Sequence, residues 1–364
     1  MLSKIALSFV SGLGCKSYRQ LMEIYNSPEE VFALSHSELT NIFGKHKSII
    51  TAIEQKSTFA RAEEELRFCE KHHIKPLYFT DREYPQRLNR AGCEDTPPLL
   101  YYMGSADLNT ERTISVVGTR KATEIGKENT RKLIDDLQHE NILVVSGLAY
   151  GIDTQAHTTA TEHNIPTIGV VAHGLDQLYP PQNRNLAKTM VQTEGGLLTE
   201  YPSQTRINPS YFPARNRIIA AMSDAIIVVE ASEKGGALIT ANLGNGYHRD
   251  VFAFPGRVDD KYSTGCNRII SNGRAVLIQN ADDVFSLMNW SRKNNAQAQQ
   301  TTMVLDLTPD QTKIHTILSQ HGPMAIEEIM EHTSLSLPKI AAALLDMELK
   351  NICRCLPGKT YKLN

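Results

Sequence analysis

Short, almost continuous runs of apolar residues recur along the middle of the chain, and polar stretches of helical length separate them. Such runs are typical of strands that are buried on both faces, as in a parallel sheet covered by helices. The pattern predicts an α/β fold whose core, residues 73–290, is a Rossmann-like, mostly parallel sheet. The runs lie at 113–117, 142–145, 167–171, 225–229 and 250–254.

The amino-terminal region has a different pattern, with apolar residues at helical spacing and glycines between them. It predicts a helical domain, residues 1–72, of the helix-hairpin-helix or SAM-like kind. The turn Gly12-Leu13-Gly14 could present backbone N–H groups to nucleic-acid phosphate, with Lys16 and Arg19 close in sequence. Glycine turns are also common in helical domains that bind no DNA, so DNA contact here is the less favoured interpretation.

The carboxyl-terminal region begins with a polar stretch, residues 291–303, that is typical of a flexible linker. Residues 304–364 then show three helical patterns and a hairpin pattern, which together predict a winged-helix domain. From Asp306 onward the chain has six Lys or Arg and seven Asp or Glu residues. We therefore expect this domain to contact protein, or DNA only weakly, rather than to bind phosphate strongly.

Composition excludes several classes of protein. The chain has 364 residues, 41% hydrophobic and 21% charged, as in ordinary soluble proteins. Neither a membrane span nor a signal peptide is indicated, so we expect a cytoplasmic protein without membrane contact. Six scattered cysteines form no CxxC pair and indicate no metal site. The net charge of −2 argues against a protein coated in basic residues but permits a local basic groove.

Glycine and polar residues follow nearly every predicted strand. Ligands bind beyond the carboxyl ends of parallel strands, so these loops are expected to converge on one site. The loop Gly118-Thr119-Arg120 does not match the GxGxxG pattern of a nicotinamide site, and the chain has no P-loop. Backbone donors and cationic side chains favour a phosphate ligand instead, and no cofactor is expected.

One wall of this site is expected at residues 212–217. Phe212 and Pro213 predict the start of a helix, which would leave the N–H groups of the next three residues without partners. Arg215 and Arg217 would point roughly 200° apart on that helix, so both cannot face one phosphate. We expect one of them to bind DNA and the other to pair internally, with Glu200 as the expected partner.

Asp153 and His157 lie one helical turn apart and invite a catalytic interpretation. No serine, cysteine or second carboxylate accompanies them in sequence to complete a reaction centre. We favour a structural interpretation, in which Asp153 caps the helix after Gly151 and His157 packs on the inner face of that helix.

The ordered set of motifs resembles the DprA/Smf family of DNA-processing proteins. The matching motifs are VGTR at 117–120, SGLAYGID at 146–153, GLDQLYP at 174–180, LTEYP at 198–202, FPARNRII at 212–219, VEA at 229–231, GALIT at 236–240 and FPG at 254–256. The resemblance implies a non-enzymatic protein that binds single-stranded DNA without sequence specificity. It also implies a homodimer that protects incoming DNA and loads the RecA recombinase onto it during natural transformation.

The resemblance places the family's functional arginine at Arg120 and its helix entry at 215–217. The chain departs from the family pattern at Gly235, where serine is common, and at 208–210, where a basic residue is usual. Other cations, including Arg184 and Lys188, could compensate. The expected DNA-binding or phosphate-binding residues are Gly118, Thr119, Arg120, Ser146, Gly147, Arg184, Lys188, Arg215, Asn216, Arg217, Lys234, Gly235 and Gly236.

An enzymatic alternative is a nucleoside-monophosphate phosphoribohydrolase, which has a similar glycine-rich Rossmann domain. Such enzymes carry a Pro-Gly-Gly-x-Gly-Thr motif with a downstream glutamate. The corresponding stretch here, residues 234–240, has neither feature.

Overall fold

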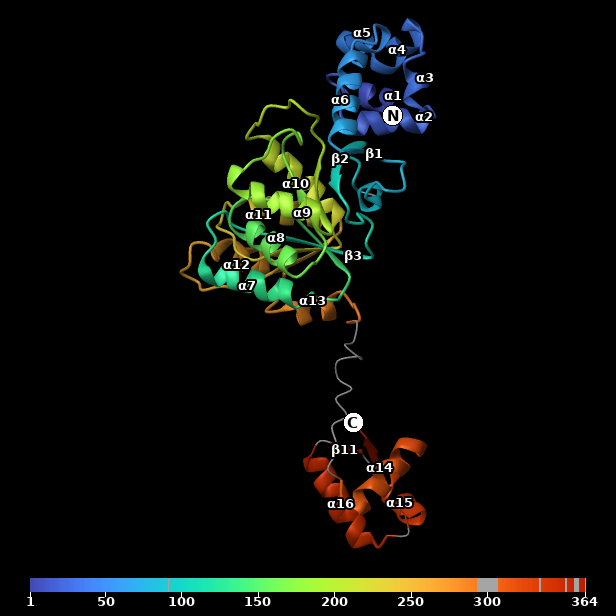
Figure 1. Cartoon of the computed structure of the whole chain (residues 1–364), viewed down its shortest axis with the longest axis vertical. Coiled ribbons are helices and arrows are strands. Elements are labelled where there is room, and N and C mark those ends of the chain that lie inside the picture. The colour runs from blue at the N-terminus through green and yellow to red at the C-terminus, as the bar shows by residue number, and fades with distance from the viewer. Residues whose placement is uncertain (91, 293–306, 334, 351, 357–359, 364) are drawn as a thin grey trace. The chain divides into compact units, whose positions relative to one another are not determined.

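The computed structural model describes residues 1–90, 92–292, 307–333, 335–350, 352–356 and 360–363. The chain forms two compact units, Met1–Arg292 and Lys293–Asn364 (Figure 1). Most of the predicted linker, residues 293–303, lies outside the described residues.

The first unit is built on one nine-stranded sheet in the order β1-β2-β6-β5-β4-β3-β7-β8-β9. From β6 to β9 in that order, each strand pairs in parallel with the next. At the other edge, β1 pairs antiparallel with β2, and β2 pairs antiparallel with β6. All five predicted strands are confirmed. The strands are β1 Lys75–Tyr78, β2 Leu99–Gly104, β3 Arg112–Val117, β4 Ile142–Ser146, β5 Thr167–Val170, β6 Gly195–Thr199, β7 Ala225–Val228, β8 Asp250–Ala253 and β9 Val276–Leu277.

Helices cover both faces of the parallel part of the sheet, as the fully apolar strands require. Alternate residues of β4 show this, because Val145 belongs to the core cluster that includes residues of α10 and α11, whereas Val144 belongs to the cluster that includes residues of α7, α8 and α13. The helices of this region are α7 Glu124–Asp135, α8 Ile152–Glu162, α9 Arg184–Gln192, α10 Tyr211–Met222, α11 Gly236–Gly246, α12 Thr264–Ser271 and α13 Ala281–Leu287, with short 3-10 turns η1 Gln86–Asn89 and η2 Pro181–Asn183.

The amino-terminal residues form a helical bundle that packs on the β1–β2 edge of the same sheet (Figure 1). Its core continues into Tyr78 of β1 and Tyr101 of β2. A buried carboxylate adds a polar connection, because Glu65 accepts hydrogen bonds from the N–H (2.9 Å) and hydroxyl (2.6 Å) of Ser203, just beyond β6. The helices are α1 Leu2–Ser8, α2 Cys15–Ile24, α3 Pro28–Val31, α4 His36–Phe43, α5 Lys47–Glu54 and α6 Phe59–Lys71.

The second unit has the three helices and the hairpin that the sequence predicts for a winged helix. Thr308 caps α14 by accepting from the N–H of Gln311, as its position before Pro309 suggests. The elements are α14 Pro309–His321, β10 Met324–Ala325, α15 Ile326–Thr333, α16 Leu337–Leu349, β11 Cys353–Leu356 and β12 Thr360–Leu363. Across both units, the described helices include none that is long and apolar enough to span a membrane.

Candidate functional site

A pocket of about 420 Å³ lies at the carboxyl ends of β3 and β7. The chain leaves β3 toward β4 on one side, whereas β7 pairs on the other side, so this is the point where the strand order reverses. Ligands of open α/β sheets bind at such a point. The pocket is lined by Val117, Gly118, Thr119, Arg120, Ala149, Asp153, Tyr179, Pro209, Phe212, Pro213, Arg215, Asn216, Ile219, Ala231, Gly235, Gly236, Ala237, Ile239 and Thr240.

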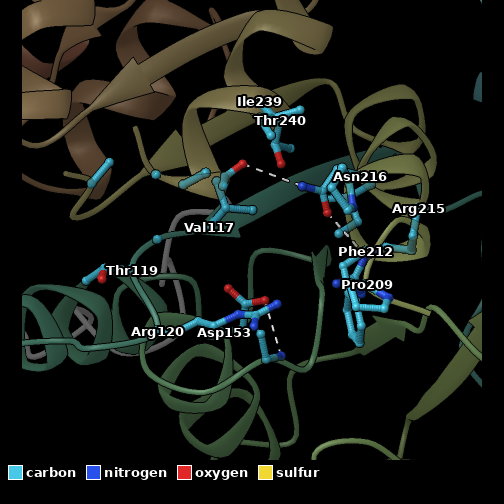
Figure 2. A pocket seen from close by; sticks show the side chains of 18 of the residues that line it. Val117, Thr119, Arg120, Asp153, Pro209, Phe212, Arg215, Asn216, Ile239 and Thr240 are labelled. Atoms are coloured by element: carbon cyan, nitrogen blue, oxygen red, sulfur yellow. Dashed lines mark hydrogen bonds between the residues drawn. The ribbon is translucent and has the colours of Figure 1, made fainter. Parts of the chain in front are cut away.

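Three elements form its walls. Thr119 and Arg120 come from the loop after β3, Phe212 and Asn216 from α10, and Ile239 and Thr240 from α11 (Figure 2). Arg120 is exposed, and its guanidinium carbon lies 5.3 Å from the centroid of the Phe212 ring. This cation–π contact orients the guanidinium at the pocket wall without using its hydrogen-bond donors.

The inner part of the pocket contains a buried pair of opposite charges. Arg215 is 4% exposed and donates to the carbonyl oxygens of Gly147 (2.7 Å) and Val170. Asp153 is 7% exposed and accepts from the N–H groups of Gly147 (3.1 Å) and Ala149 (3.3 Å). A Cβ atom on Gly147 would lie 2.7 Å from both Asp153 Oδ2 and Arg215 Nη2, so this position requires glycine.

Each charge of this pair opposes the pKa shift that burial causes in the other residue. Burial raises the pKa of the Asp153 carboxyl, and the Arg215 charge opposes that shift. Burial lowers the pKa of Arg215 to about 10, and Asp153 opposes that shift. Arg215 therefore remains protonated at neutral pH and supplies positive potential to the pocket from beneath its surface.

The start of α10 corrects one sequence expectation. The helix begins at Tyr211, two residues before Pro213, and the N–H of Ala214 bonds to the carbonyl of Ser210 at 3.4 Å. The N–H groups of Ala214, Arg215 and Asn216 are thus inside the helix rather than free for a ligand, which makes that prediction wrong. Pro213 is still tolerated because the first turn needs no N–H from it.

The start of α11 does offer free donors. Gly235 is the N-cap and no side chain caps the helix, while the N–H groups of Gly236 and Ala237 have no hydrogen-bond partner among the described residues. The start of α7 is different, because Glu230 accepts from the N–H of Thr123 at 3.0 Å and occupies that position with a carboxylate. The amino end of α11 is therefore the helix start that can receive an anion from the pocket.

Several predicted site residues lie elsewhere. Arg217 forms a bidentate pair with Glu200 at 2.6 Å for both contacts, which confirms the internal pairing and corrects its inclusion as a phosphate ligand. Ser146 is buried and donates to the carbonyl of Val116 at 2.6 Å, so its hydroxyl does not face the pocket. Arg184 and Lys188 are exposed on α9 and do not line the pocket, and neither does the exposed side chain of Lys234.

The structure supports a structural role for Asp153 and His157. His157 is fully buried, and its Nδ1 lies 2.7 Å from the Thr167 hydroxyl, as expected for packing on the inner face of α8. Burial lowers the pKa of His157 to about 3. Asp153 holds the preceding loop rather than capping α8, a detail that corrects the expected contact. In the described part of the chain, no three His, Cys, Asp or Glu side chains gather to hold a metal ion.

The sequence did not point to Ile239 and Thr240 as pocket residues. Both lie in the first two turns of α11, and Ile239 is 41% exposed despite its apolar side chain. Their position three and four residues after Gly236 is the signal that could have identified them, because it places them above the helix start.

Comparison with known proteins identifies the family. Residues 75–289 match the family model for DNA recombination-mediator protein A, and residues 297–359 match that for the DprA winged helix domain. The chain belongs to the DprA/Smf family. Protein Smf of Synechocystis is 32% identical over 98% of this chain and 97% of its own length. The DNA processing protein DprA of Streptococcus pneumoniae is 40% identical over 53% of this chain and 67% of its own length.

Solved structures of family members have the same fold. The S. pneumoniae DprA structure superposes with a TM-score of 0.68 at 31% identity, covering 79% of this chain and 97% of the other. The Helicobacter pylori DprA structure, which concerns a single-stranded DNA binding mode, gives a TM-score of 0.52 at 27% identity, covering 59% of this chain and 95% of the other. This chain is thus a member of a family that includes relatives named DNA processing proteins.

Proposed function

We propose that this DprA/Smf protein binds single-stranded DNA, without sequence specificity, in the pocket at the ends of β3 and β7. The observation that carries the proposal is the convergence of Arg120, the buried Arg215 charge and the free N–H groups of α11 on one concave site. These groups suit a backbone phosphate, which is the same at every position of a strand whatever its sequence. The H. pylori relative, whose structure concerns single-stranded DNA binding, supports this ligand class.

Aromatic rings beside the cations supply a place for bases. The rings of Tyr179 and Phe212 both line the pocket, with centroids 5.5 Å apart at an interplanar angle of 60°. Tyr179 is 36% exposed, so part of its ring is accessible to a ligand. Stacking on aromatic rings tolerates every base, which suits a protein that takes DNA of any sequence, and duplex DNA offers no unstacked base to such a site.

A salt series of DNA binding tests the proposal. Wild-type protein is titrated with single-stranded and double-stranded oligonucleotides, alongside Arg120→Ala and Arg184→Ala as a matched control outside the pocket. We expect a preference for single strands, a loss of about tenfold or more in Arg120→Ala, and no loss in Arg184→Ala. The slope of log affinity against log salt should fall by about 0.7 for each lost phosphate contact.

Two outcomes would contradict the proposal. Equal losses in the two variants would mean that general charge, rather than this pocket, holds the strand. Release of free base from nucleoside monophosphates would show hydrolase chemistry and favour the phosphoribohydrolase alternative.

The family resemblance extends the proposal to partners. The protein acts in the cytoplasm as a homodimer that protects incoming single strands and loads the RecA recombinase onto them during transformation. Support for a protein contact comes from edge strand β9, where Val276 is 50% and Leu277 41% exposed, because an open apolar edge invites a partner. Sedimentation as a monomer at micromolar concentration, or unchanged RecA assembly on protected strands, would contradict these roles.

A further inference from the structure

A second cavity, of about 280 Å³, lies between α2 and the segment that joins β1 to β2. We call it the α2 cavity; Lys16, Arg19 and Gln20 line it from α2, and Phe79 and Arg90 line it from the joining segment. The DNA-binding role proposed above assigns no function to this cavity. Its wall combines an aromatic ring with several cations, which is the combination that single-strand binding sites use.

The aromatic wall of the α2 cavity is rigid. The guanidinium carbon of Arg19 lies 4.9 Å from the centroid of the Phe79 ring. The same guanidinium donates to Asn89 Oδ1 at 2.9 Å and, through Nε, to the carbonyl of Thr96 at 3.2 Å. Arg19 is therefore fixed by the neighbouring backbone and cannot swing toward a distant partner, so it contributes a pre-oriented planar surface and a positive charge.

The other polar groups that α2 contributes to the cavity are available to a ligand. Lys16 is exposed, and neither it nor Gln20 forms a side-chain hydrogen bond or ion pair within the described residues. The Arg90 side chain is 53% exposed, and its Nη1 lies 3.6 Å from Asp224 Oδ1. Asp224 forms a closer ion pair with Arg87, whose Nη2 lies 2.7 Å from Oδ2. Gly14 is the N-cap of α2 and no side chain caps the helix, which leaves N–H donors beside Lys16.

The charge balance indicates which ligand fits. Glu23 and Glu94 also line the α2 cavity, so its cations exceed its carboxylates by only a small margin. A polyphosphate would meet repulsion from these carboxylates, whereas one nucleotide of a strand brings a single phosphate charge and an apolar base face. The cavity therefore suits a nucleotide within a chain better than a free, highly charged anion.

The Arg217 side chain contacts residues that are next in sequence to the lining of the α2 cavity. Asn216 lines the first pocket, and the next residue, Arg217, donates to the carbonyl of Asp95 at 3.0 Å and contacts Cys15 Sγ at 3.8 Å. Asp95 follows Glu94 and Cys15 precedes Lys16, and both of these neighbours line the α2 cavity. Arg217, which lines neither site, thus lies between residues adjacent to each, so the two sites are neighbours within the first unit.

We infer that the α2 cavity is a second subsite for single-stranded DNA, which holds a nucleotide of the strand whose neighbouring part occupies the first pocket. The phosphate lies against Lys16 and Arg90, and the base lies against the apolar part of the cavity at Phe79. The inference rests on the proposed function and adds the amino-terminal helical domain to the DNA path.

Strand length tests the inference. Oligothymidylates of about 4 and about 16 nucleotides, at the short and long ends of single-strand site sizes, are titrated against the full-length protein. The variants are Lys16→Glu and Gln20→Glu, with Lys45→Glu as a matched charge reversal at another exposed lysine of the same domain. We expect Lys16→Glu to weaken binding of the long strand about fivefold or more and to lower its salt slope by about 0.7, while binding of the short strand stays unchanged. Gln20→Glu keeps the shape of the side chain and should weaken the long strand in the same way.

Each other outcome overturns the inference. Unchanged binding of the long strand in both α2 variants removes the subsite, and equal losses in Lys45→Glu reduce the effect to general charge. Equal losses for short and long strands would mean that the substitutions act on the first pocket. Two other results would contradict the proposed function rather than the second subsite. They are absent binding by the wild type and unchanged binding of both strands by Arg120→Ala.

Discussion

At the scale of single residues, the most informative contrast is between Arg215 and Arg217. Helical geometry predicts that two residues so spaced diverge, and the structure confirms that Arg217 pairs with Glu200. Sequence did not indicate that Arg215 would also be withdrawn from solvent. Its guanidinium lies beneath the pocket beside Asp153, so its contribution to ligand binding is positive potential rather than an exposed hydrogen-bonding group.

Removing Arg215 should therefore affect stability first. We expect Arg215→Ala to lower the free energy of unfolding by about 3–5 kcal/mol at neutral pH, because it leaves Asp153 as a buried charge without a counterion. The double variant Arg215→Ala, Asp153→Asn should recover part of that loss. Urea denaturation of the three proteins measures both effects.

The loss in Arg215→Ala should depend on pH. Burial already raises the pKa of Asp153, and the raised value should increase further without Arg215. The folded state then binds a proton more readily than the unfolded state, so stability falls as pH rises from about 4. The destabilisation should be smallest near that pH and largest at neutral pH. A loss that is the same at every pH would show that lost packing, rather than the charge of Asp153, is responsible.

At the scale of elements, the starts of three helices differ in what they offer a ligand. The first turn of α7 is occupied by Glu230, and α10 begins too early to leave the expected donors at 214–216. Only the start of α11 combines free N–H groups with a position at the pocket, among the helices that the structure describes there. The sequence predicts free N–H donors at the starts of both α10 and α11. Of these two helices, the structure leaves such donors at the start of α11 alone.

Substitution of Gly236 tests the contribution of the backbone N–H groups of α11 to DNA binding without altering the charge of the protein. Gly236 is the first residue of α11, where proline fits well, and a Cβ atom there would meet nothing within 4 Å. Gly236→Pro removes the N–H, whereas Gly236→Ala keeps it and serves as the control. We expect Gly236→Pro to weaken single-strand binding about tenfold and Gly236→Ala to change it little. Equal affinities in fluorescence polarisation would exclude the N–H as a phosphate donor.

At the scale of the whole molecule, the two units differ in the kind of ligand that their surfaces suit. The pocket belongs entirely to the first unit. In the second, the exposed face of α16 carries Leu337 at 50% and Leu345 at 59% exposure, with Lys339 as its cation before the helix ends. An apolar surface on this helix favours protein contact over phosphate contact.

Truncation after residue 292 tests this division of roles. We expect the shortened chain to keep its single-strand affinity to within tenfold, equivalent to about 1.4 kcal/mol, because the second unit adds few net charges. Binding of the full-length and truncated proteins to the same oligonucleotide measures the difference. A larger loss would assign the winged helix a direct part in holding DNA.

The sequence by itself determined the class of fold, the buried strands and the residues that follow them, because runs of β-branched residues and glycine-rich turns are local signals. It did not indicate β6 as a strand of its own, since Gly195 and Gly196 lower strand propensity. The sequence also predicted that the loop of Arg120 and the start at Gly236 converge, and both line the first pocket. Only the tertiary structure decided which cations face that site. The carbonyl oxygens of Gly147 and Val170 hold Arg215 beside Asp153, and Glu200 pairs with Arg217. These partners are distant in sequence, and such contacts depend on how the strands and helices are brought together.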